Sequence, residues 1–258
     1  MDDKALDPQG PIALGVMCKA PTAGTSKTRL SPPVSREEAA WLSRCFMADL
    51  AAIVGSVAPA FDVRGFVVFT PPEGQGAFDG LAPAGFGILP QRGNDLSERC
   101  ANAIEDLLAR GCAGACLWNA DSPTLPVATL EAAVTALRRP GDRVVLGPAL
   151  DGGYYLVGAK RSVPELFRAI AWSTSRAMAD TEARAFQLGL AVERLPAWYD
   201  IDDGIALAWL LRELLGDGIP PVANGLRGSP APQTRAYLSA LAARGEGPPP
   251  SVITDLGG

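Results

Sequence analysis

Short apolar segments alternate along this chain with segments that have the pattern of amphipathic helices. We expect strands over residues 12–17, 63–69, 86–89, 115–118, 144–147, 154–157 and 192–195. We expect helices over residues 35–55, 95–110, 126–140 and 174–187, from the Asp200–Asp203 segment through 215, and over 233–243. Ser35 with Glu38 three residues on fits a capping box for the first helix, Asp95 can cap the second, and Ser173 or Thr174 is expected to cap the fourth. Strands that alternate with helices usually pair in parallel, because each helix carries the chain back to the same edge of the sheet. The sequence therefore predicts an α/β, Rossmann-like fold with a mostly parallel sheet and helices on both faces.

The expected strands and the helices between them fit within one domain over residues 11–216. The segment after it is rich in glycine and proline, and it precedes the last predicted helix and a tail with three consecutive prolines. We therefore treat residues 217–258 as a C-terminal linker, helix and loose tail. Residues 1–10 are polar and acidic, and we expect them to be disordered.

The chain contains no histidine among its 258 residues. This excludes Ser–His–Asp and Cys–His catalysis, histidine general bases and histidine metal ligands. Any chemistry must use carboxylates, cations, hydroxyls, backbone dipoles or a metal ion with oxygen ligands. The net charge of −5 argues against nucleic acid as a partner.

Other features of the sequence indicate where the protein is located. No apolar run reaches the length of a membrane span, and the polar start of the chain does not resemble a signal peptide. The spacing of the five cysteines matches no zinc site, and nothing in the sequence indicates secretion. We therefore expect reduced thiols, no membrane span and a cytoplasmic location.

The loop after the first predicted strand, residues 18–32, reads CKAPTAGTSKTRLSP. It combines Gly24 with the cations Lys19, Lys27 and Arg29, and backbone N–H groups and positive charge in such a loop can hold a phosphate. A solvated surface loop is the structural alternative. An exposed lysine contributes little to stability, so we expect Lys27→Ala to abolish nucleotide binding and to leave the fold intact. The loop is neither a P-loop, because Ser26 replaces the required glycine, nor a dinucleotide fingerprint.

Two acidic segments follow predicted strands and can hold a metal ion. Asp121 follows the buried strand 115–118 and precedes Ser122-Pro123, so its carboxylate is placed to ligate Mg²⁺ or Mn²⁺. Its alternative role is to cap the next helix, although Thr124 is better placed for that. Asp202 or Asp203 is expected to cap the helix that follows, which leaves Asp200 freer to act as a ligand.

The remaining polar motifs have an equally plain structural reading. Asp151 lies in a turn between two strands, where it can accept a hydrogen bond from a hydroxyl or act as a base, or simply cap the turn. The glycines that follow it, Gly152 and Gly153, permit close approach of a ligand. Asp95 and Arg99 stand one helical turn apart and can form a simple ion pair.

The motifs K-x-P-x-x-G-x-x-K-T-R-L, G-x-D-L-x-x-R, A-D-S-P-x-L, L-G-P-x-x-D-G-G-Y-Y-L-x-G, W-S-T and W-Y-D-I-D-D occur in that order over about residues 12–215. As a set they resemble the DUF2064 group of glycosyltransferases, of the type sometimes linked to arsenosugar biosynthesis. The resemblance implies a GT-A-like fold of the nucleotide-diphospho-sugar transferase superfamily, with a nucleotide on the first loop and a metal ion at Asp121. The same motifs are similar to those of 2-phospho-lactate guanylyltransferases and molybdopterin nucleotidyltransferases. This chain lacks their D-I-D-T-P segment, and it also lacks the D-x-D of many sugar transferases.

These observations give one set of expected site residues. Catalysis is assigned to Lys27, Arg29 and Asp151; nucleotide binding to Lys19, Ala20, Pro21, Gly24, Lys27, Arg29, Asp95 and Arg99; substrate binding to Gly152, Gly153, Tyr154 and Trp172; and Mg²⁺ or Mn²⁺ binding to Asp121, Asp200 and Asp202. The expected partners are a nucleotide or nucleotide-sugar donor and a small-molecule acceptor. Three hypotheses stay open: glycosyl transfer that releases a nucleoside diphosphate, nucleotidyl transfer that releases pyrophosphate, and nucleotide binding without turnover.

Overall fold

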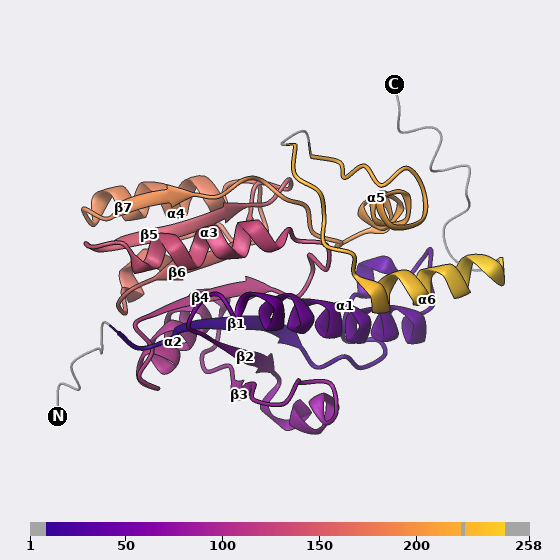
Figure 1. The fold of residues 1–258 in the computed structure, drawn as a ribbon, viewed down its shortest axis with the longest axis horizontal. Helices are drawn as coiled ribbons and strands as arrows, with labels where there is room; N and C mark the ends of the chain where they lie inside the picture. The colour runs from indigo at the N-terminus through magenta and orange to yellow at the C-terminus, as the bar shows by residue number, and fades with distance from the viewer. Residues whose placement is uncertain (1–8, 223–224, 246–258) are drawn as a thin grey trace.

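The structure, a computed structural model, describes residues 9–222 and 225–245. Its centre is a seven-stranded sheet with the strand order β3-β2-β1-β4-β6-β5-β7 (Figure 1). The strands are β1 (Ile12–Lys19), β2 (Val63–Thr70), β3 (Gly87–Pro90), β4 (Gly114–Asn119), β5 (Arg143–Pro148), β6 (Tyr154–Ala159) and β7 (Ala191–Arg194). All neighbours pair in parallel except β6, which runs antiparallel to both β4 and β5. The predicted mostly parallel α/β sheet is therefore confirmed.

Helices cover both faces of this sheet, as predicted. They are α1 (Arg36–Val57), α2 (Leu96–Leu108), α3 (Val127–Arg138), α4 (Ala177–Gln187), α5 (Gly204–Leu215) and α6 (Pro232–Ala243). Buried side chains of α1, α3, α5 and α6 form one apolar cluster with one face of the sheet. Those of α2 and α4 form a second cluster with the opposite face. Alternate residues of each central strand enter the two clusters, which explains why these strands are apolar throughout.

The first residues of the helices show which of the predicted side-chain caps form. Ser35 and Glu38 form the predicted capping box of α1, and Asp95 caps α2 by accepting a hydrogen bond from the Glu98 N–H. The predicted start of α4 near Thr174 is wrong, because α4 begins at Ala177. The Thr174 hydroxyl instead bonds within the preceding turn, donating to the Ala171 carbonyl and accepting from the Arg176 N–H.

Helix α1 has the length and apolar composition of a membrane span, but its role is in the core. In its most apolar 18-residue window, 67% of the residues are buried inside the protein. Helix α6 packs beside it, and the buried Asp49 carboxylate of α1 accepts the N–H groups of Gln233 and Thr234, both at 2.9 Å. The C-terminal helix thus joins the main core. The predicted loose tail lies outside the described residues.

The sheet brings the ends of distant segments together at one edge. Strands β1, β4 and β5 all finish at this edge, and the antiparallel strand β6 begins there. In Figure 1 this is the end toward α5 and α6. Ligands of open α/β sheets bind beyond the carboxyl ends of the strands, so this edge is where a site is expected.

Candidate functional site

The loop that follows β1 turns Lys27 inward, toward the carboxyl edge of the sheet. The loop leaves the strand through a hydrogen bond from the Ala20 N–H to the Thr70 carbonyl, and Gly24 adopts a φ of +78°. Lys27 is itself left-handed, with φ 52° and ψ 36°, and it directly precedes a short 3-10 helix whose Leu30 is fully buried. The buried leucine anchors the loop, and the left-handed residue reverses its direction just before the anchor.

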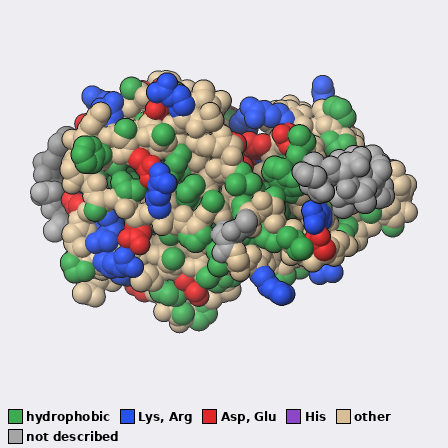
Figure 2. Space-filling view, turned by 90° about the horizontal axis from the view of Figure 1, so that it is seen from above, with side chains coloured by type: hydrophobic (Ala, Val, Ile, Leu, Met, Phe, Trp, Pro, Cys, Tyr) green, Lys and Arg blue, Asp and Glu red, His purple; other side chains and the backbone are tan. Residues whose placement is uncertain are grey.

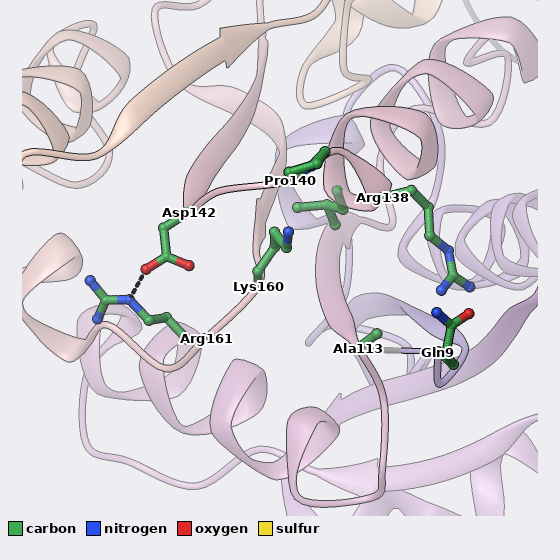
Figure 3. Close-up of a pocket in the computed structure, with 8 residues that line it drawn as sticks. Gln9, Ala113, Arg138, Pro140, Asp142, Lys160 and Arg161 are labelled. Carbon is green, nitrogen blue, oxygen red and sulfur yellow. Dashed lines mark hydrogen bonds and ion pairs between the residues drawn. The ribbon is translucent and has the colours of Figure 1, made fainter. Parts of the chain in front are cut away.

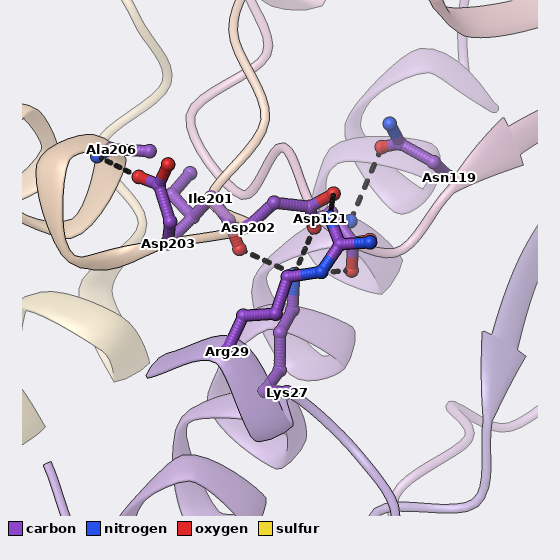
Figure 4. Close-up of polar contacts among 8 residues, drawn as sticks. All are labelled: Lys27, Arg29, Asn119, Asp121, Ile201, Asp202, Asp203 and Ala206. Carbon is purple, nitrogen blue, oxygen red and sulfur yellow. Dashed lines mark hydrogen bonds and ion pairs between the residues drawn. The ribbon is translucent and has the colours of Figure 1, made fainter. Parts of the chain in front are cut away.

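Lys27 connects three separate segments of the chain (Figure 4). Its Nζ lies 2.7 Å from Asp121 Oδ1, donates to the Ile201 carbonyl at 2.6 Å and lies 3.4 Å from Asp202 Oδ1. The side chain is only 7% exposed, and the ammonium group stands 5.6 Å from the centre of the Phe46 ring. The expectation of an exposed lysine is therefore wrong: Lys27 is a buried cation that joins the two predicted acidic segments.

Asp121 follows β4 at the strand tip, as predicted. Its N–H donates to the Asn119 side chain, and its carbonyl accepts from the Ile201 N–H at 2.8 Å. Burial raises the pKa of Asp121, whereas the Lys27 ammonium group opposes this rise and the nearby Asp202 adds to it. The predicted capping role of Thr124 is wrong, because α3 has no side-chain cap and the Thr124 hydroxyl lies 3.4 Å from the Tyr199 hydroxyl.

The second acidic segment divides its three carboxylates between different roles. Asp203 caps α5 by accepting a hydrogen bond from the Ala206 N–H at 2.9 Å, as one of the two predicted alternatives requires. Asp202 faces Lys27 and lies 3.9 Å from Arg29, whose side chain is 72% exposed. Burial and the repulsion of Asp151, Asp202 and Asp121 raise the pKa of Asp200 to about 7. Four carboxylates from three segments therefore converge at this edge.

A buried hydrogen bond next to the Asp200–Asp203 segment was not predicted from the sequence. The Tyr199 hydroxyl donates to a carboxylate oxygen of Glu213 on α5, and both side chains are buried. Burial raises the pKa of Glu213, and the hydrogen bond from Tyr199 opposes that rise. The sequence hints at this contact only by placing a glutamate, Glu213, within the apolar run of α5. Tyr199 immediately precedes Asp200, so this contact fixes the start of the acidic segment.

Replacing Tyr199 by phenylalanine tests that support. We expect Tyr199→Phe to lower the free energy of unfolding by about 1–3 kcal/mol, because it leaves the buried Glu213 carboxyl without its donor. Urea denaturation of purified protein measures the change. Glu213→Gln retains a hydrogen-bond acceptor for Tyr199 and is expected to cost less. Equal losses in the two variants would contradict the role of the hydrogen bond.

The turn between β5 and β6 presents Asp151 to the same edge. Asp151 Oδ1 accepts from the Gly153 N–H at 2.8 Å, which is the turn-capping alternative, while its second oxygen has no such bond. Gly152 has a φ of +87°, and a Cβ atom there would lie 2.3 Å from the Ser175 carbonyl oxygen. The close approach that Gly152 permits is thus, in this structure, to the protein's own backbone.

The other predicted site residues bond or pack with neighbouring groups of the protein, or lie in the first loop. Tyr154 and Trp172 contact each other edge to face, with ring centres 5.8 Å apart, and the Trp172 indole N–H donates to Ser97. Asp95 is used as a helix cap, and Arg99 donates to the Gly93 carbonyl at 3.1 Å. Lys19 ends β1 with an exposed side chain, whereas Ala20 and Pro21 are buried. The roles assigned to these residues stay predictions.

A cavity of about 260 Å³ opens beside the acidic segment. It is lined by Arg29, Leu150, Asp151, Tyr199, Asp200, Asp202, Asp203, Ile205, Ala206 and Trp209. Figure 2 shows acidic and basic side chains beside a hollow toward the end of the molecule that carries α5. The cavity therefore brings together two of the proposed metal ligands, the proposed base and the exposed cation of the first loop.

The donor atoms at this edge suit a hard divalent cation. Asp121, Asp200 and Asp202 offer only carboxylate oxygens, and their mutual repulsion with Asp151 marks an excess of negative charge. Among the described residues, no group of three such side chains is already arranged as a metal-binding cluster. Asp121 and Asp202 instead share the Lys27 ammonium group. These carboxylates fit Mg²⁺ or Mn²⁺ by their chemistry.

A second cavity, of about 430 Å³, lies at the opposite edge of the sheet (Figure 3). Its cations already have protein partners. Arg138 donates to the Gly10 and Asp62 carbonyls, Lys160 to the Arg139 carbonyl and Arg161 to the Asp142 carboxylate. This cavity is separate from the carboxyl edge, and we assign it no part in the site.

Comparison with known proteins agrees with the resemblance seen in the sequence. The profile of the family described as "Uncharacterized protein conserved in bacteria (DUF2064)" matches residues 53–174. A crystal structure from Desulfovibrio desulfuricans G20, named "putative nucleotide-diphospho-sugar transferase", superposes with a TM-score of 0.76 at 25% identity. The superposition covers 91% of this chain and 96% of that one. The predicted resemblance to DUF2064 proteins and the GT-A-like fold are thus confirmed.

More distant structures share the fold alone. A cytidylyltransferase from Leptospira borgpetersenii serovar Hardjo-bovis has a TM-score of 0.53 at 12% identity, over 95% of this chain and 98% of that one. A CMP:2-keto-3-deoxy-manno-octonic acid synthetase in complex with CTP has a TM-score of 0.52 at 12% identity, over 81% of this chain and all of that one. A search of curated protein sequences found no match.

Proposed function

We propose that this protein is a metal-dependent glycosyltransferase, which moves a sugar from a nucleotide-sugar donor to a hydroxyl group of a small molecule and releases a nucleoside diphosphate. One observation carries the proposal: Lys27, Asp121, Asp202 and the neighbouring Asp200 converge at the carboxyl edge of a GT-A-like sheet. The similarity to the Desulfovibrio protein, over nearly the full length of both chains, favours a sugar donor.

The cations of the first loop would bind the donor's phosphates. Arg29 is the exposed cation at the cavity, and Lys19 is exposed at the end of β1. Lys27 is held between carboxylates, so it contributes a fixed positive charge and keeps both acidic segments in place. Asp121, Asp200 and Asp202 would hold Mg²⁺ or Mn²⁺, which when bound neutralises phosphate charge and stabilises the leaving diphosphate.

Asp151, which lines the cavity, would act on the acceptor. Its carboxylate would accept the proton of the acceptor hydroxyl as that oxygen forms a bond to the sugar's anomeric carbon. The bond between this carbon and the phosphate oxygen breaks, and its electron pair leaves with the nucleoside diphosphate. One carboxylate oxygen accepts the Gly153 N–H, which leaves the other available for the acceptor hydroxyl.

The products of turnover test the proposal directly. We expect purified protein with Mg²⁺ or Mn²⁺ to release nucleoside diphosphate from at least one member of a panel of nucleotide sugars when a panel of small hydroxyl-bearing acceptors is supplied, and EDTA to abolish the release. A parallel panel of nucleoside triphosphates, assayed for pyrophosphate with phosphorylated acceptors, provides the contrast. Pyrophosphate release without diphosphate release would overturn glycosyl transfer in favour of nucleotidyl transfer, and tight binding without turnover would favour a binding protein.

We also assign the protein to the cytoplasm. All five cysteines are buried and none forms a disulfide. Burial raises the pKa of the thiols, for example that of Cys45 to about 11, which keeps them protonated. Buried, protonated thiols agree with the reduced state expected in a cytoplasmic protein.

A further inference from the structure

The cavity beside the acidic segment has an apolar wall that the proposed chemistry does not use. Leu150, in the turn before Asp151, is 46% exposed, and Ile205, in the first turn of α5, is 54% exposed. Trp209 stands one helical turn after Ile205, and its ring packs edge to face on Tyr199 with centres 6.3 Å apart. These side chains line the same cavity as Asp151 and Asp200.

The wall is formed by two segments that are distant in the chain. Large aliphatic side chains that are half exposed cost free energy in water, at roughly 25 cal/mol for each Å² of apolar surface. A single exposed residue of this kind needs no explanation, but two that face one cavity from different elements form a surface that an apolar group can cover. The wall therefore offers contact to a ligand's carbon skeleton.

Negatively charged side chains outnumber positively charged ones around the cavity. Asp151, Asp200, Asp202 and Asp203 supply carboxylates, and Arg29 is the cation among the lining residues. The Lys27 ammonium group is already paired with Asp121 and Asp202, so the donor's diphosphate would pair with Arg29 and a bound metal ion. A second phosphorylated molecule at Asp151 would then face carboxylates and the donor's own phosphates, which is strongly unfavourable.

We infer that the acceptor is a neutral or cationic small molecule that carries an apolar portion next to its reacting hydroxyl, and that it is not phosphorylated. The inference rests on the proposed function, and it names the class of acceptor for that site. The apolar portion covers Leu150, Ile205 and Trp209, while the hydroxyl donates to Asp151. The hydroxyl proton passes to that carboxylate, and the diphosphate leaves with the electron pair of the broken bond.

Binding of three probe molecules to the full-length protein with Mg²⁺ tests this inference. Phenyl β-D-glucoside carries an aryl group and hydroxyls, methyl β-D-glucoside lacks the aryl group, and phenyl phosphate replaces the sugar by an anion. We expect phenyl β-D-glucoside to bind at least about tenfold more tightly than either of the others in calorimetry or saturation-transfer NMR, since an apolar contact of this size changes affinity by that factor.

Two isoleucine variants test whether the aryl group of the probe contacts the apolar wall. Ile205→Ser is expected to weaken binding of phenyl β-D-glucoside about tenfold and to leave methyl β-D-glucoside nearly unchanged. Ile219→Ser is the matched control, because Ile219 is 57% exposed and does not line the cavity. Equal binding of phenyl phosphate and phenyl β-D-glucoside, or equal effects of the two variants, would overturn the inference.

Release of nucleoside diphosphate by wild-type protein from the panel of nucleotide sugars, assayed with a panel of small acceptors that carry hydroxyl groups, reports separately on the proposed function. No release from any nucleotide sugar, together with selective binding of the aryl glucoside, would reject glycosyl transfer and leave the preference of the cavity established. Release of diphosphate without selective binding of the aryl glucoside would support glycosyl transfer and reject the acceptor class that we infer.

Discussion

Replacing Lys27 by methionine is expected to lower the free energy of unfolding by about 2–3 kcal/mol. Methionine keeps most of the apolar stem but removes the ammonium group, so Asp121 and Asp202 lose their shared cation and the Ile201 carbonyl loses its donor. Removing one partner of a buried pair usually costs about 3–5 kcal/mol. We expect less here because the Asp121 and Asp202 side chains are 33% and 44% exposed. Urea denaturation measures the loss.

Two further variants separate this effect from a general loss of charge in the loop. Arg29→Ala removes a cation that is 72% exposed, and it is expected to change stability by less than about 1 kcal/mol. The double variant Lys27→Met/Asp121→Asn removes both partners, so it is expected to be more stable than the sum of the single losses predicts. Strict additivity, or a loss no greater than that of Arg29→Ala, would show that Lys27 does not act as a structural cation.

The sequence placed the segments after β1 and β4 at one edge of the sheet, where the structure has them, but it misjudged the environment of Lys27. The segments after β1 and β4 could be placed at one edge because alternating strands and helices leave few ways to build a sheet. The burial of Lys27 could not be predicted, since it depends on the Ile201 carbonyl, 174 residues further along the chain. The Tyr199–Glu213 hydrogen bond could not be predicted for the same reason. The residues around Tyr199 and Glu213 in the sequence do not indicate that the two side chains bond to each other.

The errors at helix starts have a local cause. Serine and threonine can bond to a helix end, to a turn or to another side chain, and propensity does not decide between these partners. Thr174 bonds within a turn, and Thr124 faces Tyr199. Asp95 caps its helix as predicted, and Asp203 proves to be the cap where the sequence left Asp202 and Asp203 as alternatives; each side chain accepts an N–H of the first turn.

Replacing Asp121 by asparagine is expected to reduce turnover by at least about 100-fold, which is about 2.7 kcal/mol of transition-state stabilisation. Asparagine keeps the size of the side chain but removes the charge that would hold a divalent ion against the donor's phosphates. Asp121 is the strongest candidate for this role because it lies just beyond the end of the central strand β4 and its backbone is fixed by Asn119 and Ile201. Affinity for nucleoside diphosphate, measured by calorimetry with Mg²⁺, is expected to fall with turnover.

The matched control is Asp203→Asn, a neighbouring change that also removes one carboxylate from the cavity. Asp203 caps α5, and asparagine caps a helix about as well as aspartate, so this variant is expected to retain stability and most of its activity. Stability must be measured for both variants, because Asp121→Asn also weakens the pair with Lys27. With each protein shown to be folded, EDTA should abolish nucleotide binding by wild type and change little in Asp121→Asn. Binding and turnover that withstand both EDTA and the Asp121 substitution would rule out a metal site at this strand tip.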